Sequence, residues 1–105
     1  MVNSSFKALA HPIRREIVAR LATGPAAVGE ITGDLGVSKP AISKHLKVLE
    51  ETGVVSRVIE GRTHVLSLET AVLDEATEWM VRQRAIWTRM FDAVEDHLKE
   101  KKKKK

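Results

Sequence analysis

The segment from Ala26 to Leu49, AAVGEITGDLGVSKPAISKHLKVL, constrains the fold of this chain more than any other part of its sequence. Apolar residues at spacings of three and four predict a helix over about residues 27–35. Gly36 follows at once, where glycine ends a helix in the left-handed conformation at least cost. Ser38 then stands at the N-cap of a second helix, predicted over about residues 39–52. Two short helices joined by such a turn are typical of a helix-turn-helix.

The second helix of this pair has one apolar face and one cationic face. Ile42, Leu46 and Leu49 are predicted to face the core, while the stretch 38–48 carries three lysines and no acid. A helix that enters a DNA major groove needs cations near phosphate and acids kept away from it. We therefore expect double-stranded DNA as the partner, although an ordinary solvated helix face is the alternative. The predicted contacts on this helix are Ser38, Lys39, Ser43, Lys44, His45 and Lys47.

A β-hairpin is predicted directly after the two helices. Residues 54–60 and 63–68 are rich in β-branched side chains, and only Gly61 and Arg62 separate them. A helix-turn-helix followed by a hairpin is a winged helix. We expect Arg62 at the tip to enter the minor groove and Arg57 to lie near the flanking phosphates. The alternative for Arg62 is that it only solvates the loop.

The N-terminal third is predicted to support these elements. A short helix around Phe6 and a second one over about residues 12–22 complete a mainly α fold with one small β-hairpin, in the order α-α-α-α-β-β-α. The three arginines of the second helix are expected to be solvated or paired with Glu16 rather than to read a groove. His11 is expected to cap or pack rather than to bind a ligand.

A long amphipathic helix is predicted over about residues 71–99. It carries both tryptophans and one of the two phenylalanines, and large aromatic residues and methionines on one face are typical of a protein interface. We expect a homodimer through the terminal helices, with recognition helices about 34 Å apart. The alternative is that the stripe packs only on its own domain. The predicted interface residues are Phe6, Trp79, Met80, Gln83, Ile86, Trp87, Met90, Phe91 and Val94.

The overall basicity of the chain comes from its last five residues. The 105 residues carry a net charge of +4 from 18 basic and 14 acidic residues. Removing the lysines at 101–105 leaves 13 basic and 14 acidic residues, a net charge of −1. The argument for DNA therefore rests on where charges lie, not on their sum. We predict one domain over residues 1–100 and a disordered lysine tail over 101–105.

Several function classes are excluded by what the sequence lacks. Without cysteine there is neither a disulfide nor a thiolate metal site. There is no apolar signal region, and no stretch approaches the ~18 apolar residues of a membrane span. We expect a cytoplasmic protein with no membrane partner. Lacking a Gly-rich phosphate loop, a cysteine nucleophile and a carboxylate pair at a pocket, the chain is not expected to be an enzyme or to need a cofactor.

Three segments carry a resemblance to a known family: FKALAHPIRREIVARL, VSKPAISKHLKVLEETGVV and the hairpin ending in GRTHVLSL. Over about residues 4–100 the chain resembles the ArsR/SmtB family of bacterial transcriptional regulators. The resemblance implies a dimeric repressor that binds a pseudo-palindromic operator and leaves DNA when an effector binds. It places Ser43, Lys44 and His45 at DNA-facing positions and Arg62 on the wing. For His45, packing between helices without contact to DNA is the alternative.

The metal sites of that family are incomplete in this chain. One site uses cysteines on the first helix of the helix-turn-helix, and residues 26–32 contain none. The other joins an Asp-x-His pair to a His-x-x-Glu pair between C-terminal helices. His97 and Glu100 keep the latter spacing, whereas Arg84 and Ile86 stand at the former. Half a site offers too few ligands for Zn²⁺, so we expect no metal.

The effector is left open as a small molecule, a protein or none. Two other functions remain as alternatives: a winged helix used for protein–protein contact, and a metal-responsive repressor that uses the C-terminal helix. The acid-free outward face of residues 38–48 favours DNA over a protein partner, because a protein-docking surface needs apolar anchors there.

Overall fold

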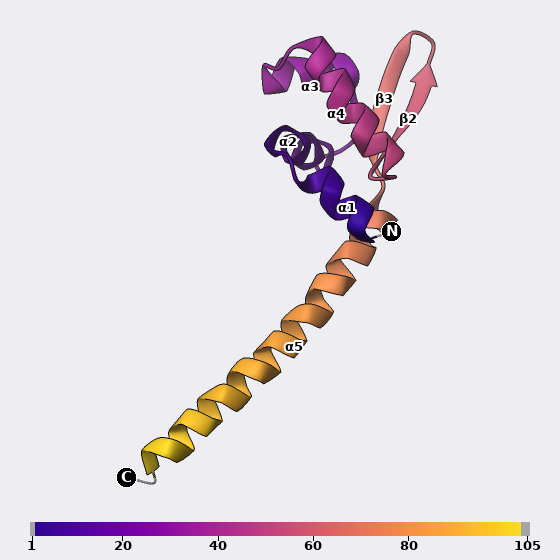
Figure 1. The fold of residues 1–105 in the computed structure, drawn as a ribbon. Coiled ribbons are helices and arrows are strands. Elements are labelled where there is room, and N and C mark those ends of the chain that lie inside the picture. The colour runs from indigo at the N-terminus through magenta and orange to yellow at the C-terminus, as the bar shows by residue number, and fades with distance from the viewer. Residues whose placement is uncertain (1, 104–105) are drawn as a thin grey trace.

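The computed structural model describes the backbone of residues 2–103 and the side chains of residues 3–102. Within that range, helices and a small antiparallel sheet of strand order β1-β3-β2 form a winged helix (Figure 1). The elements are α1 (Val2–Leu9), α2 (Pro12–Leu21), β1 (Ala26–Ala27), α3 (Val28–Leu35), α4 (Lys39–Glu51), β2 (Val55–Glu60), β3 (Thr63–Leu68) and α5 (Thr70–Lys103).

The turn between α3 and α4 forms as the sequence predicts. Gly36 has φ +62°, and its N–H donates to the carbonyl of Thr32 at 3.1 Å, which ends α3. Ser38 is the N-cap of α4, where its hydroxyl oxygen accepts from the N–H of Ala41 at 3.4 Å. The predicted boundaries of both helices are confirmed to within one residue. The orientation of α4 is thus set by local signals at its own start.

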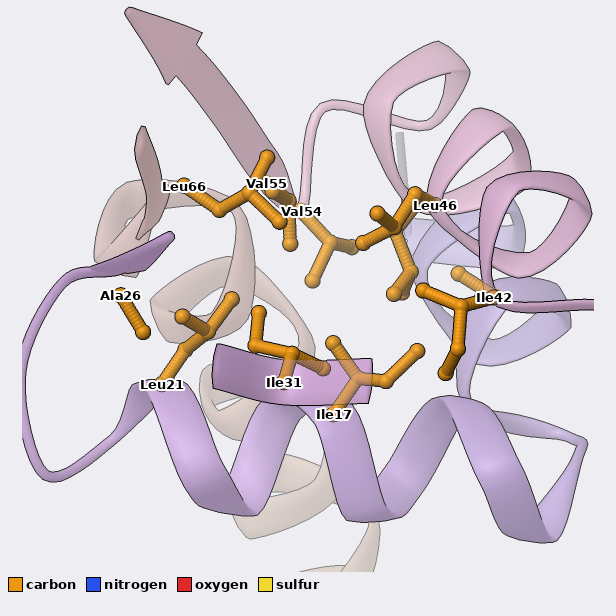
Figure 2. Close-up of a cluster of buried hydrophobic side chains, with 11 residues drawn as sticks. Ile17, Leu21, Ala26, Ile31, Ile42, Leu46, Val54, Val55 and Leu66 are labelled. Atoms are coloured by element: carbon orange, nitrogen blue, oxygen red, sulfur yellow. The ribbon is translucent and has the colours of Figure 1, made fainter. Parts of the chain in front are cut away.

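The core lies between α2, α3, α4 and the sheet (Figure 2). The predicted inner face of α4 is confirmed, because Ile42, Leu46 and Leu49 are completely buried. Each such side chain contributes about 1.5–3 kcal/mol through burial. The cluster consists of Ala8, Ile17, Leu21, Ala26, Ile31, Ile42, Leu46, Leu49, Val54, Val55 and Leu66.

Strand β1 is absent from the predicted order of elements, which has to be corrected to α-α-β-α-α-β-β-α. Ala26 and Ala27 pair with Leu66 and Val65 of β3 across the sheet. Two alanines carry no strand preference of their own. They extend because β3, forty residues away, offers an open edge for hydrogen bonding. A local reading of the sequence could not detect this pairing.

The arginines of α2 join that helix to its neighbours. Arg14 and Arg15 donate to backbone carbonyls at the C-terminal end of α1. Arg20 pairs with Asp34 of α3 at an Nε–Oδ2 distance of 2.7 Å. The expected pairing with Glu16 is therefore wrong, whereas Arg15 is exposed as expected. Their partners lie on other elements, which the spacing within one helix does not reveal.

Helix α5 begins on the domain and then leaves it. Val72 and Leu73 pack against the core and Ala76 is buried, but the helix continues as a long arm beyond the other elements (Figure 1). The radius of gyration is 20.2 Å, whereas a compact domain of this length has about 13 Å. Most of the 34-residue helix therefore has no packing partner within the described chain.

The helix also extends further than predicted. It continues through Lys103, so the first three lysines of the run at 101–105, expected in a disordered tail, are helical. Lysine is a good helix former, and neither glycine nor proline interrupts this stretch. Residues 104 and 105 lie outside the described part. No helix between residues 2 and 103 has both the length and the apolarity to cross a membrane.

Candidate nucleic-acid interface

The outward face of α4 carries exposed cations that are free to meet an external anion. Lys39, Ser43, Lys44 and Lys47 are all exposed. Of the lysines, Lys47 has an ion-pair partner on the same helix, a glutamate at 4.0 Å, and both side chains are largely solvated. Such an exposed pair is worth little and is easily exchanged for another anion. The lysines predicted to face outward from α4 are therefore on its solvent-exposed side in the structure.

A groove joins this face to the hairpin. It has a volume of about 280 Å³ and lies between the start of α3, α4 and the wing. Lys39 and Ser43 from α4 share it with Arg62 from the hairpin turn, which follows them by some twenty residues in the sequence. Figure 1 shows the hairpin standing beside α4. The full lining is Val28, Lys39, Ser43, Leu46, Arg57, Arg62 and His64.

Arg62 and Arg57 differ in their surroundings. Arg62 is exposed at the turn, with no hydrogen-bond or ion-pair partner among the described residues. The guanidinium of Arg57 is held instead: Nε and Nη2 donate to Oε1 of Glu50, the first at 3.1 Å, and Nη1 contacts Nδ1 of His64 at 2.9 Å. The fold thus brings both predicted wing arginines to one groove but leaves only Arg62 free.

Glu50 and His64 were not among the predicted site residues. Glu50 follows the acid-free stretch of α4, and His64 is an inward member of β3. Each is seven residues from Arg57, on a different element. No spacing rule within one helix or strand relates such positions. The hairpin register and the exit of the chain from α4 bring them together.

His45 faces α2 rather than the open side of α4. It is partly buried, its ring centroid lies 4.3 Å from that of His11, and its Nδ1 is 3.5 Å from Nη1 of Arg14. Burial lowers the pKa of His45 from its usual value of 6.5, and the nearby His11 and Arg14 lower it further. These contacts favour the packing role that was the alternative for this residue.

His11 serves as the N-cap of α2. Its backbone is extended, and its Nδ1 accepts a hydrogen bond from the N–H of Ile13 at 3.1 Å. The prediction that this histidine caps or packs is confirmed. Ser38 plays the corresponding part for α4, so one predicted DNA contact also has a structural duty.

The second surface of interest is the apolar face of α5. Trp87 is 63% exposed and Phe91 69% exposed. Two apolar hollows meet at Trp87, one of about 390 Å³ toward Trp79 and one of about 250 Å³ toward Val94. The alternative that this stripe packs on its own domain is wrong for residues 84–102, all of which are exposed.

The start of this stripe does contact its own chain. The rings of Phe6 in α1 and Trp79 meet edge to face at a centroid distance of 5.5 Å and an interplanar angle of 68°. Phe6 and Trp79 were both predicted in the interface. Their contact fixes the first turns of α5 on α1 and leaves the remaining predicted residues uncovered.

Metal-binding side chains are sparse. Among the described residues, no group of three or more His, Asp or Glu side chains is placed to hold a metal ion. His97, Arg84 and Ile86 all lie exposed on α5. The absence of a metal cofactor stays a prediction.

Known proteins match this chain in sequence and in structure. A family model described as bacterial regulatory protein, arsR family, matches residues 11–57. The transcriptional repressor SdpR of Bacillus subtilis is 38% identical over 80 residues, which are 76% of this chain and 89% of SdpR. The HTH-type transcriptional regulator Rv2034 of Mycobacterium tuberculosis is 49% identical over 65 residues, 62% of this chain and 61% of Rv2034.

The solved structures agree with the sequence matches. An ArsR-like transcriptional regulator from Rhodococcus sp. RHA1 has a TM-score of 0.76 and 31% identity to this chain. The match covers 89% of this chain and 88% of the Rhodococcus protein. It therefore extends over the winged helix and well into α5.

Proposed function

Since this chain belongs to the arsR family of bacterial regulatory proteins, and is a DNA-binding transcriptional regulator rather than an enzyme, we propose that it acts as a homodimeric repressor at a pseudo-palindromic operator. The observation that carries the proposal is the groove in which Lys39 and Ser43 of α4 meet Arg62 of the wing. Two elements that approach DNA from neighbouring grooves here share one cationic surface.

The contacts are assigned by exposure and by the chemistry of each side chain. Ser43, Lys44 and Lys47 project from α4 and are proposed to reach base edges or phosphates of the major groove. Lys39 lies in the first turn, where the helix dipole also favours an anion. Arg62 is proposed to enter the minor groove, whose negative potential attracts arginine. The held Arg57 and the inward His45 are left out of this contact set.

A second copy of this chain is proposed to cover the apolar face of α5. Soluble monomers rarely expose a contiguous apolar surface of this kind, and here it runs along an arm that no described part of the chain covers. The helix is about 50 Å long at 1.5 Å per residue. Pairing two such arms would bury both tryptophan-rich stripes and set the two recognition helices at a fixed separation.

The charges along α5 also point to a second copy. They alternate in blocks: acids at 74–78, arginines at 82–89, acids at 92–96 and mostly lysines at 99–103. Two parallel helices in register would place each block beside its like. An antiparallel pair with its two-fold axis at about residue 89 sets every acidic block beside a basic one. Such a pair separates the two starts of α5, at Thr70, by about 57 Å, so it predicts half-sites farther apart than the 34 Å expected from the sequence. Opposite charges that flank a helix seam decide partner and orientation.

The compartment and the effector follow from the same reasoning. We place the regulator in the cytoplasm, because it has to share a compartment with the DNA that it binds. Its effector is proposed to be a small molecule or a protein. A metal ion is disfavoured because the chain has no cysteine and because Arg84 and Ile86 offer no oxygen or imidazole ligand.

Binding to selected DNA tests this function. Duplexes recovered from a library of genomic fragments by repeated binding would be compared with scrambled versions by fluorescence anisotropy near physiological salt. A preference of about 10³ or more is expected of a sequence-reading regulator. A variant lacking residues 101–105 serves as the control for nonspecific attraction by lysine. Equal binding to both duplexes would contradict the proposal and favour a winged helix that docks a protein.

A further inference from the structure

Among the described side chains, one polar link joins the hairpin to the recognition helix, from Arg57 near the base of the hairpin to Glu50. Val55 at the base of β2 and Leu66 of β3 are buried in the core. From Arg57 to the end of β2 every residue is exposed. Beyond Arg57 the residues of β2 pair with β3, but no hydrogen bond or ion pair of the described residues ties their side chains to an element outside the hairpin. The hairpin stands out from the helices beside it (Figure 1).

Arg57 bridges the end of α4 to β3. Two of its nitrogens donate to the same carboxylate oxygen of Glu50, and a third meets Nδ1 of His64 at 2.9 Å. Since arginine has no acceptor, Nδ1 of His64 is the acceptor of this hydrogen bond. All three guanidinium nitrogens are thus engaged by two partners, and Glu50 balances the charge.

The strand register explains why these three side chains meet. Arg57 pairs with Leu66, so His64 is its diagonal neighbour on the same face of the hairpin. Long side chains reach across such a diagonal. That face turns toward α4, where Glu50 lies in the last turn. The side chains of Arg57 and Glu50 are 30% and 32% exposed, so the pair is better protected from solvent than the other ion pairs on α4 and α5.

We propose that Glu50, Arg57 and His64 form a cluster that holds the wing at a fixed angle to the recognition helix, and that Arg57 is a positioning residue rather than a phosphate contact. The cluster sets where Arg62 stands relative to Lys39 and Ser43 across the groove. The inference rests on the proposed DNA-binding function. It adds that recognition by the wing depends on an acidic residue that itself repels phosphate.

The salt dependence of binding separates positioning from contact. A phosphate contact contributes about 0.9 to the slope of log K against log salt concentration. We expect Arg57→Met to weaken binding to the selected duplex by about three- to tenfold while leaving that slope unchanged. The matched control is Arg62→Met, the same change in the partner-free arginine of the hairpin, which is expected to lower the slope by about 0.9. A lowered slope for Arg57→Met would overturn the proposal.

Neutralising Glu50 changes the affinity for the selected duplex in opposite directions, depending on whether Arg57 contacts phosphate or positions the wing. If Arg57 contacts phosphate, Glu50→Gln releases it and binding tightens. If Arg57 positions the wing, Glu50→Gln disturbs the cluster and weakens binding to the selected duplex. Glu51→Gln is the matched control, because it removes the same charge from the neighbouring residue, whose ion pair is long and solvated. We expect Glu50→Gln to bind several-fold more weakly than both wild type and Glu51→Gln, and binding equal to or tighter than that of wild type would overturn the inference.

Binding by the wild-type chain distinguishes failure of the positioning role from failure of the proposed DNA-binding function. If wild type does not prefer the selected duplex, the proposed function fails and the role of the cluster falls with it. If wild type prefers that duplex and the variants behave as phosphate contacts, only the positioning role is lost. Circular dichroism spectra of all four variants, matching that of wild type, establish that changes in affinity do not arise from unfolding.

Discussion

Lys44 is the residue on which the DNA reading of α4 can be tested most directly. It is exposed, whereas Ile42 and Leu46 on the opposite side of the same turn are completely buried. Its charge can therefore be removed without touching the core. No acid lies within the stretch 38–48 to neutralise it.

We expect Lys44→Ala to weaken binding to the selected duplex. If the ammonium reads a guanine, the loss is about 1–3 kcal/mol and falls on that base pair alone. If it meets a phosphate, selected and scrambled duplexes lose affinity alike. Anisotropy titrations with both duplexes measure this difference. Unchanged affinity for both would remove Lys44 from the contact surface.

The histidine next to it predicts a pH dependence of stability. Because burial lowers the pKa of His45 below 6.5 in the folded chain, protonation costs more in the folded state than in the unfolded one. The stability contributed by the neutral ring is complete above pH 6.5. It is lost as the pH falls from 6.5 through the lower pKa of the folded state.

His45→Gln removes this contribution. We expect its unfolding free energy to change less between pH 8 and pH 5 than that of wild type, measured by urea denaturation at each pH. His97→Gln, a change on the exposed face of α5, serves as the control and should keep the wild-type dependence. Identical pH dependence in wild type and His45→Gln would show that this ring does not couple folding to protonation.

Two glycines near the end of α3 allow its stop signal to be tested at the scale of the element. Gly36 has φ +62°, while Gly33 lies in the helix, and a Cβ at either position meets nothing within 4 Å. Their responses to alanine therefore report backbone conformation alone. We expect Gly36→Ala to cost about 1–2 kcal/mol and Gly33→Ala to stabilise by about 0.5–1 kcal/mol. Chemical denaturation measures both, and equal effects would contradict a left-handed stop at Gly36.

Helix α5 differs from the other helices because most of its length has no packing partner among the described residues of its own domain. Its first turns pack through Val72, Leu73 and the contact of Trp79 with Phe6. The rest is held as a helix by its backbone, by favourable composition and by pairs such as Glu95 with Lys99 at 3.9 Å. Such pairs add only about 0.2–0.5 kcal/mol each. A second copy would supply the packing that this length requires.

At the scale of the whole molecule, one substitution on the stripe tests the dimer. Trp87→Glu places a charge in the middle of the exposed apolar face, and we expect a monomer by sedimentation. Loss of the linked second half-site should weaken binding to a two-half-site duplex by about 10²-fold or more. Thr88→Glu introduces the same charge one residue away, off the stripe, and should remain dimeric. A Trp87→Glu variant that still sediments as a dimer would contradict the assigned interface.

Cross-linking tests the orientation of the two arms. The chain contains no cysteine, so a single introduced thiol reports one position. An antiparallel pair centred at about residue 89 places Met80 of one copy opposite Leu98 of the other and separates like residues by about 27 Å. We expect Met80→Cys and Leu98→Cys to be cross-linked by a short thiol reagent only when refolded together. Cross-linking of either variant alone would favour a parallel pair.

Much of the recognition unit could be predicted because its signals are local. Gly36 ends α3 and Ser38 begins α4 through contacts with residues three or four positions away. The buried face of α4 follows from helical periodicity, and the hairpin from two β-branched runs around Gly61. The residues that determine each of these features lie within about ten to fifteen positions of one another in the sequence.

The features that the sequence did not predict depend on residues far apart or on different elements. Ala26 and Ala27 become a strand only because β3 presents an edge to them. Arg57 looks like a free wing cation until Glu50 and His64 are placed around it. His45 lies within a cationic helix but turns toward His11.

The sequence by itself therefore determined the helices, the hairpin, the family and the cationic face of α4, since periodicity, capping and charge spacing act along the chain. Only the tertiary structure decided which of those charges are free. Two arginines look the same in a sequence whether or not a carboxylate lies beside them in the fold. An arginine already paired with a carboxylate is not free to bind a DNA phosphate, whereas an unpaired one is. In this protein that difference separates Arg57, bound to Glu50, from Arg62, which has no partner among the described residues.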